Sequence, residues 1–128
     1  MSRTILIVDD EFGIVEVLAA ALSDHGYGIM QAYNGAQALA RIADEVPDLV
    51  ISDYMMPGGD GGALLATIAR EFAAIPVILM SAVDEVSIKR AGISYTAFLR
   101  KPFRIAEMLD AVRRLVGHGG DADNAGIH

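Results

Sequence analysis

The stretch LVISDYMMPGGDG, residues 49–61, carries the most information about the fold. It begins with an apolar, β-branched run of the kind expected for a strand that is buried on both faces of a parallel sheet. The run ends at Asp53, which is followed by Tyr54, then by Met-Met-Pro and a glycine-rich segment. The sequence therefore places a carboxylate at the end of a buried strand, beside a backbone that glycine leaves conformationally free.

Runs of the same kind occupy residues 4–8 and 76–80, and weaker ones occupy 28–32 and 97–99. The segments between these runs repeat apolar residues at helical spacing. Strand and helix thus alternate about five times. Because parallel strands need right-handed crossover connections, this alternation predicts an α/β fold in which helices cover both faces of a five-stranded parallel sheet.

The composition indicates one soluble domain of 128 residues. No apolar stretch approaches the roughly 20 residues of a membrane span, and the N-terminus lacks a signal-peptide pattern, so we expect a cytoplasmic protein. Cysteine is absent and histidine occurs only three times, which argues against thiolate or zinc sites. A formal net charge of −7 argues against nucleic acid or anionic membranes as the main partner and favours a cation or a protein.

Three acidic residues directly follow predicted strands. Asp9 and Asp10 follow the first strand, and Asp53 follows the third. In open α/β sheets, ligands bind at the carboxyl ends of the strands, so these carboxylates converge there if the two strands are neighbours. Converging carboxylates repel one another unless a cation neutralises them, and Mg²⁺, which prefers oxygen ligands, suits such a place.

Four separated motifs, in this order, resemble the receiver domain of two-component response regulators, of the chemotaxis-regulator-like single-domain type. They are Asp9-Asp10-Glu11, Asp53 with Met56-Pro57 and Asp60-Gly61, Ser81-Ala82, and Lys101-Pro102-Phe103. The resemblance covers about residues 3–117. It implies a flavodoxin-like sheet in the order 2-1-3-4-5 with five helices, a receiver domain over residues 1–117 and a flexible tail over 118–128.

The resemblance implies that Asp53 accepts a phosphoryl group from the phosphohistidine of a histidine kinase or phosphotransfer protein. Ser81 and Lys101 would each bind one phosphoryl oxygen, and Phe98, three residues before Lys101, stands at the aromatic switch position. Such chemistry is plausible because a carboxylate is a competent nucleophile, and transfer needs mainly positioning and charge stabilisation. The chain would be no enzyme beyond catalysing its own phosphorylation and dephosphorylation.

The resemblance also implies a metal site. Asp10, Asp53 and the backbone carbonyl of Met55 would bind Mg²⁺, for which Mn²⁺ could substitute, and Asp9 would act through water. Downstream, the fourth helix, fifth strand and fifth helix would form a switchable surface for an unknown protein target or for a second copy of the chain.

Several alternatives stand beside these expectations. Asp9 or Asp10 alone could cap the first helix, Ser81 could cap the fourth, and Lys101 could be a solvated surface residue. The chain could be a module excised from a hybrid histidine kinase or a larger regulator. An aspartyl-phosphate phosphohydrolase of the haloacid dehalogenase type would carry a second aspartate at position 55, where this chain has methionine. A flavodoxin-like cofactor binder would need a phosphate loop after the first strand, where this chain has acids.

Three features depart from the family pattern. Gly59 and Gly62 replace apolar residues, which predicts a mobile loop after Asp53. Arg104 replaces the usual cap of the last helix, which predicts a weaker or different start. The segment from Ser81 to Lys101 is short and contains glycine, so we expect a marginally stable fourth helix.

Overall fold

The computed structural model describes residues 3–56 and 60–119, with the side chain of residue 60 outside the description. Strands and helices alternate along the chain, as the sequence predicts. Their order is β1 (Thr4–Val8), α1 (Phe12–Asp24), β2 (Gly28–Ala32), α2 (Gly35–Asp44), β3 (Leu49–Asp53), α3 (Asp60–Glu71), β4 (Val77–Ser81), α4 (Glu85–Arg90), β5 (Ala97–Arg100) and α5 (Ile105–Val116).

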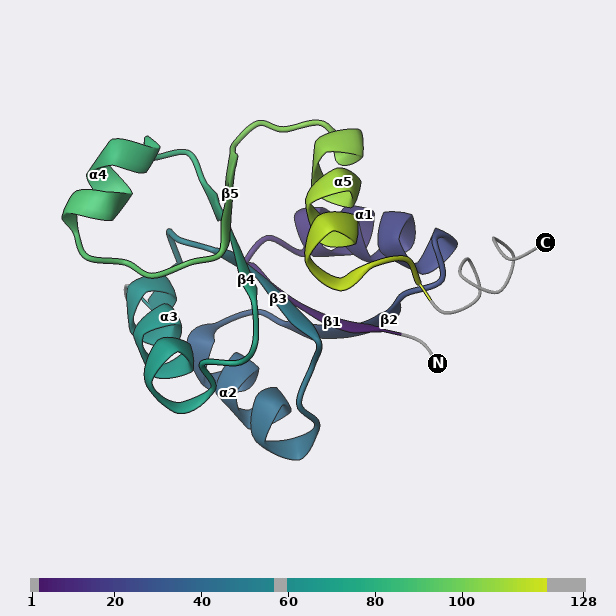
Figure 1. Cartoon of the computed structure of the whole chain (residues 1–128), viewed down its shortest axis with the longest axis horizontal. Helices are drawn as coiled ribbons and strands as arrows, with labels where there is room; N and C mark the ends of the chain where they lie inside the picture. The colour runs from purple at the N-terminus through teal and green to yellow at the C-terminus, as the bar shows by residue number, and fades with distance from the viewer. Residues whose placement is uncertain (1–2, 57–59, 120–128) are drawn as a thin grey trace.

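The five strands form one parallel sheet in the order β2-β1-β3-β4-β5. This confirms the predicted doubly wound, flavodoxin-like arrangement. Helices α1 and α5 cover one face of the sheet, and α2 and α3 cover the other, while α4 lies beyond β4 and β5 on the side of α3 (Figure 1). Each face therefore buries its own layer of strand side chains.

The alternation of side chains along the strands produces these two layers. Ile5, Ile7 and Ile51 pack under α1 and α5, whereas Leu6 and Val50 pack under the helices of the opposite face. All of them are fully buried. Because both faces are covered, the strands are apolar throughout rather than alternating, and this explains why short continuous apolar runs identified them.

The helix termini show how local sequence sets the boundaries. Asn34 caps α2 by accepting a hydrogen bond from the backbone N–H of Gln37 at 2.8 Å. Arg104 precedes α5 without a capping side chain of its own, since a guanidinium has no acceptor atom. Instead, the carboxylate of Glu107 accepts a hydrogen bond from the N–H of Arg104 at 3.1 Å. The different start predicted for this helix is therefore found.

Helix α4 is the shortest helix, with six residues, and Ile88 is its one buried side chain among the described residues. Its start is well defined, because Asp84 accepts a hydrogen bond from the N–H of Ser87 at 2.9 Å. So short a helix has little stability of its own, and its position depends on tertiary contacts.

The end of α5 packs near the turn between α1 and β2. The hydroxyl of Tyr27 donates a hydrogen bond to the carbonyl oxygen of Gly117 at 2.6 Å. Gly119 is buried, and a Cβ placed on it would lie 2.4 Å from the carbonyl oxygen of His25. The flexible tail predicted over 118–128 falls mostly outside the described residues, so it stays a prediction.

Candidate functional site

The polar side chains that are buried in the described part of the chain all lie at the carboxyl edge of the sheet. Asp9 directly follows β1, Ser52 and Asp53 end β3, and Ser81 ends β4. Burying polar groups is costly unless they are paired. Their concentration at one edge, which is where ligands bind in folds of this type, marks this edge as the functional site.

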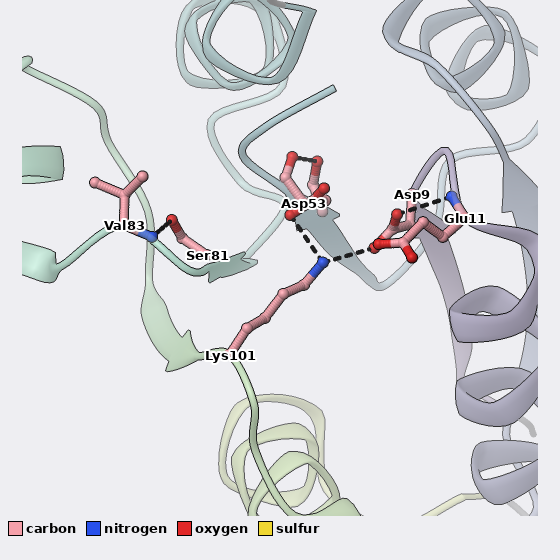
Figure 2. Close-up of polar contacts among 7 residues, drawn as sticks. Asp9, Glu11, Asp53, Ser81, Val83 and Lys101 are labelled. Carbon is pink, nitrogen blue, oxygen red and sulfur yellow. Dashed lines mark hydrogen bonds and ion pairs between the residues drawn. The ribbon is translucent and has the colours of Figure 1, made fainter. Parts of the chain in front are cut away.

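Lys101, which follows β5, joins two of these carboxylates. Its Nζ atom lies 3.1 Å from Oδ2 of Asp9 and 3.1 Å from Oδ1 of Asp53, and Figure 2 shows the ammonium between them. The backbone N–H of Lys101 also donates to the carbonyl oxygen of Ser81 at 2.8 Å. Four strand ends therefore contribute to one site, and Lys101 is no solvated surface residue.

The electrostatics of the site reflect a shortage of positive charge. Burial and the neighbouring carboxylate of Asp9 raise the pKa of Asp53, with Asp10 adding to the effect and Lys101 opposing it. Burial alone would lower the pKa of Lys101, but its hydrogen bonds and charge interactions with Asp53 and Asp9 outweigh burial and raise that pKa. The ammonium of Lys101 therefore pairs with two carboxylates of a cluster that contains three.

The three aspartates can hold a divalent cation. Asp9, Asp10 and Asp53 each offer a carboxylate oxygen, and these oxygens all lie within 4.8 Å of one another. Asp10 is exposed, so the group opens to solvent on one side. An all-oxygen donor set with room for water is the kind of site that Mg²⁺ prefers. The residues present therefore fit the predicted metal, whereas the role of the Met55 carbonyl stays a prediction.

Both oxygens of Asp9 have partners that fix its orientation. While Oδ2 pairs with Lys101, Oδ1 accepts a hydrogen bond from the backbone N–H of Glu11 at 3.0 Å. Glu11 occupies the position before α1 and makes no side-chain cap there. Neither Asp9 nor Asp10 is thus the cap of α1, the alternative role considered for them.

Ser81 is buried, and its hydroxyl is turned toward the loop that follows β4. Its Oγ atom accepts a hydrogen bond from the N–H of Val83 at 2.9 Å, and it points away from Asp53 (Figure 2). The cap of α4 is Asp84, so Ser81 is no helix cap. Residues 80 and 53 are partners in neighbouring strands, so the hydroxyl lies one residue beyond the partner of the predicted phosphoryl acceptor.

Phe98, the predicted switch residue, is half-buried in β5 and contacts the ring of Tyr95 at a centroid distance of 5.9 Å. The hydroxyl of Tyr95 donates a hydrogen bond of 2.6 Å to Glu85 at the start of α4. Desolvation and this bond raise the pKa of Tyr95 to about 12. The hydrogen bond between Tyr95 and Glu85 joins residues that are ten positions apart in the chain, so no repeating pattern in the sequence predicts it.

An apolar cavity of about 630 Å³ adjoins the site. It lies between the start of α1 and the segment after β5, and its lining includes Ile14, Val17, Lys101 and Phe103. Val17 is 55% exposed, which is high for so apolar a side chain. The carboxyl edge of the sheet is therefore flanked by open apolar surface.

Strand order and the acidic edge together define a flavodoxin-like α/β protein with a cluster of three aspartates at the carboxyl ends of its strands. The family model of the response regulator receiver domain matches residues 5–113. The chain belongs to this family and is a phospho-accepting receiver domain of the two-component type.

Curated relatives are longer proteins. The chain is 36% identical over 128 residues to the phosphate regulon transcriptional regulatory protein PhoB of Pseudomonas aeruginosa, covering 97% of this chain and 56% of the relative. It is also 36% identical over 118 residues to the response regulator MprA of Mycobacterium bovis, covering 91% and 51%. The chain thus spans about half the length of these relatives.

Solved structures agree with the fold. The chemotaxis protein CheY4 of Vibrio cholerae superposes with a TM-score of 0.83 at 25% identity, covering 91% of this chain and 100% of that one. The receiver domain of NtrX from Brucella abortus superposes with a TM-score of 0.80 at 32% identity, covering 88% of this chain and 97% of that one.

Receiver domains bind Mg²⁺ through acidic residues and interact with histidine kinases and downstream effectors. They are not enzymes in the ordinary sense.

Proposed function

We propose that Asp53 is the phosphoryl acceptor of this receiver domain and that Asp9, Asp10 and Asp53 hold Mg²⁺ or Mn²⁺ beside it. The observation that supports this most strongly is the convergence of three carboxylates and Lys101 at one edge of the sheet. Asp9 and Asp53 are both buried and both pair with Lys101. Of the two, only Asp53 belongs to β3, which pairs with the strand that carries Ser81.

In the proposed transfer, a carboxylate oxygen of Asp53 attacks phosphorus. The bond between phosphorus and the donor's histidine nitrogen breaks, the nitrogen keeps the electron pair, and an acyl phosphate forms on Asp53. Lys101, already 3.1 Å from the carboxylate, stabilises charge on one phosphoryl oxygen, and the hydroxyl of Ser81 donates to another after leaving Val83. A bound divalent cation would neutralise further negative charge at this step.

The donor we propose is a phosphohistidine of a histidine kinase or phosphotransfer protein. The open apolar surface around the cavity beside Lys101 supports a protein donor, because a phosphohistidine has to reach a carboxylate that is only 4% exposed.

The net charge of −7 continues to argue against nucleic acid and anionic membranes as partners. Within the described residues no helix has both the length and the apolar character of a membrane span. Cytoplasmic location stays a prediction.

The proposed output surface comprises α4, β5 and α5. Movement of the Ser81 hydroxyl would free the N–H of Val83, which lies directly before the cap of α4, and would open space for Phe98. Either change biases the position of a short helix with little stability of its own. A downstream protein, or a second copy of this chain, would read that change.

Incubation with acetyl phosphate and Mg²⁺, followed by intact-mass measurement, tests the acceptor. We expect the mass of one phosphoryl group on the wild-type chain and none on Asp53→Asn, which keeps the shape of the side chain. Asp10→Ala, which removes one metal ligand, should abolish the thermal stabilisation by Mg²⁺. Equal labelling of Asp53→Asn would refute the assignment of the acceptor.

A further inference from the structure

Gly61, in the first turn of α3, lies directly against the backbone that follows the phosphoryl acceptor. A Cβ atom on this residue would lie 2.1 Å from the carbonyl oxygen of Tyr54, 2.7 Å from its carbonyl carbon and 2.9 Å from the carbonyl oxygen of Asp53. All three are backbone atoms, which cannot rotate away as the end of a flexible side chain can. The backbone of Gly61 has no positive φ, so the requirement for glycine here is one of space.

The peptide group between Asp53 and Tyr54 is also held by two hydrogen bonds. The buried hydroxyl of Ser52 donates to the carbonyl oxygen of Asp53 at 3.0 Å. The N–H of Tyr54 donates to the carbonyl oxygen of Met80 in β4 at 2.9 Å. Both polar atoms of this peptide are therefore bonded, while Gly61 approaches its oxygen and, more closely, the carbonyl group of the next peptide, Tyr54–Met55.

We propose that Gly61 is a positioning residue for the cation site and the phosphoryl transfer, and that Ser52 assists it. This proposal rests on the proposed function of Asp53. Ser52 holds the peptide that links Asp53 to Tyr54. Gly61 packs against that peptide and the next one, Tyr54–Met55. Together they fix the carboxylate relative to Asp9 and Lys101. They also fix the start of the segment that carries the carbonyl of Met55.

The size of the effect follows from the contact distances. A methyl group on Gly61 would lie 2.1 Å from the carbonyl oxygen of Tyr54, whereas an ordinary contact requires about 3.4 Å. The backbones of Gly61 and Tyr54 would therefore have to separate by 1.3 Å. Misplacing a reacting group by about 1 Å can cost on the order of a hundredfold in rate. We therefore expect Gly61→Ala to slow phosphorylation by acetyl phosphate about 10- to 100-fold. Because a displaced backbone also displaces the ligand Asp53, Mg²⁺ binding should weaken at least about tenfold.

Gly62→Ala is the matched control. Gly62 stands next to Gly61 in the same helical turn, and a Cβ on it would lie 3.6 Å from Cδ1 of Ile93 and 4.0 Å from Cε1 of Tyr54, which are ordinary side-chain contacts. Both substitutions raise helix propensity equally. The control should keep the Mg²⁺ dissociation constant and the phosphorylation rate of the wild type within about twofold, since it leaves the backbone after Asp53 in place.

The experiment measures Mg²⁺ affinity by titration calorimetry, and the phosphorylation rate by intact mass, at a temperature where circular dichroism shows each variant folded. Equal values for Gly61→Ala and Gly62→Ala would overturn the positioning role. Should Gly61→Ala fail to fold, Ser52→Ala, which removes the hydroxyl without adding volume, must weaken Mg²⁺ binding, and unchanged binding would overturn the proposal. A wild-type chain that neither binds Mg²⁺ nor gains phosphoryl mass would instead overturn the proposed function.

Discussion

Replacing Lys101 by methionine removes the ammonium group that lies 3.1 Å from the carboxylates of both Asp9 and Asp53. Methionine keeps the length and apolar stem of lysine, so the packing of the chain after β5 changes little. What changes is the charge, because three carboxylates whose oxygens lie within 4.8 Å of one another lose the cation that pairs with two of them. In Mg²⁺-free buffer at neutral pH, this variant should be markedly less stable than the wild type.

The loss can be estimated from the two distances. At an effective dielectric constant of about 20, a pair 3.1 Å apart gains about 5 kcal/mol, or about 10 kcal/mol for both pairs. Most of that gain is offset by the cost of desolvating the three groups, and breaking a buried pair typically costs about 3–5 kcal/mol. Because the site opens to solvent at Asp10, we expect about 3 kcal/mol, which lowers the melting temperature of a domain this size by about 10 °C.

Differential scanning fluorimetry with and without millimolar Mg²⁺ provides the measurement. Mg²⁺ should stabilise Lys101→Met more than the wild type, because in the variant the cation relieves a repulsion that nothing else relieves. Lys89→Met is the control, since Lys89 is exposed and lies 4.0 Å from Glu85, and its loss makes the net charge more negative by the same single unit. A melting temperature for Lys101→Met within about 2 °C of the control, or equal stabilisation of both variants by Mg²⁺, would refute this account of the site.

Three further predictions concern neighbouring residues. The pKa of Asp53 is higher in the folded protein than in the unfolded chain. Ionising Asp53 therefore lowers the stability of the fold as the pH rises through the folded-state pKa, and this loss is absent at a pH well below the unfolded-state pKa. Asp53→Asn should therefore be more stable than the wild type in Mg²⁺-free buffer at neutral pH, and chemical denaturation should show this advantage shrinking toward pH 4; a constant difference would contradict it. The acyl phosphate should be long-lived, because the exposed side chain of Met55 offers no group to orient water. Met55→Asn should shorten its lifetime measured by intact mass, and an unaltered lifetime would exclude this position from the path of the water. Tyr95→Phe removes the hydrogen bond to Glu85, so amide exchange across α4 should accelerate while exchange in β1 and β3 stays unchanged; equal exchange would show that the bond does not hold the helix.

The central part of the fold could be predicted from sequence because buried parallel strands have a simple signature. The run at residues 4–8 is followed directly by Asp9, and the run at residues 49–53 ends in Asp53, so the sequence indicated the strands, their burial and the acidic site together. The strand order was implied by the family resemblance, since the apolar pattern alone does not fix which strands are neighbours. The five-stranded sheet confirms it.

The carboxylate cluster was predictable because Asp9, Asp10 and Asp53 follow strand runs, whereas the place of Lys101 in the site was implied only by the family resemblance. Contacts that depend on the conformation of a loop or on the packing of a helix were not predictable from the sequence. The sequence does not show that the Ser81 hydroxyl bonds to Val83, because a two-residue turn contact depends on loop conformation. The family resemblance separates Gly61, which belongs to a motif, from Gly62, which departs from the pattern, but the sequence does not show the close approach of Gly61 to the backbone of Tyr54, because that depends on the packing of α3.

The contact between Tyr27 and Gly117 has a consequence for longer proteins built on this fold. The turn before β2 lies at the amino edge of the parallel sheet, so the chain leaves α5 at the edge opposite Asp53. Any module joined after Gly119 would begin a full strand length from the phosphoryl group, out of reach of its charge at physiological ionic strength. Such a module would have to sense phosphorylation through a change of conformation, which is the role proposed above for α4, β5 and α5, and a second molecule could report the same event without any covalent connection.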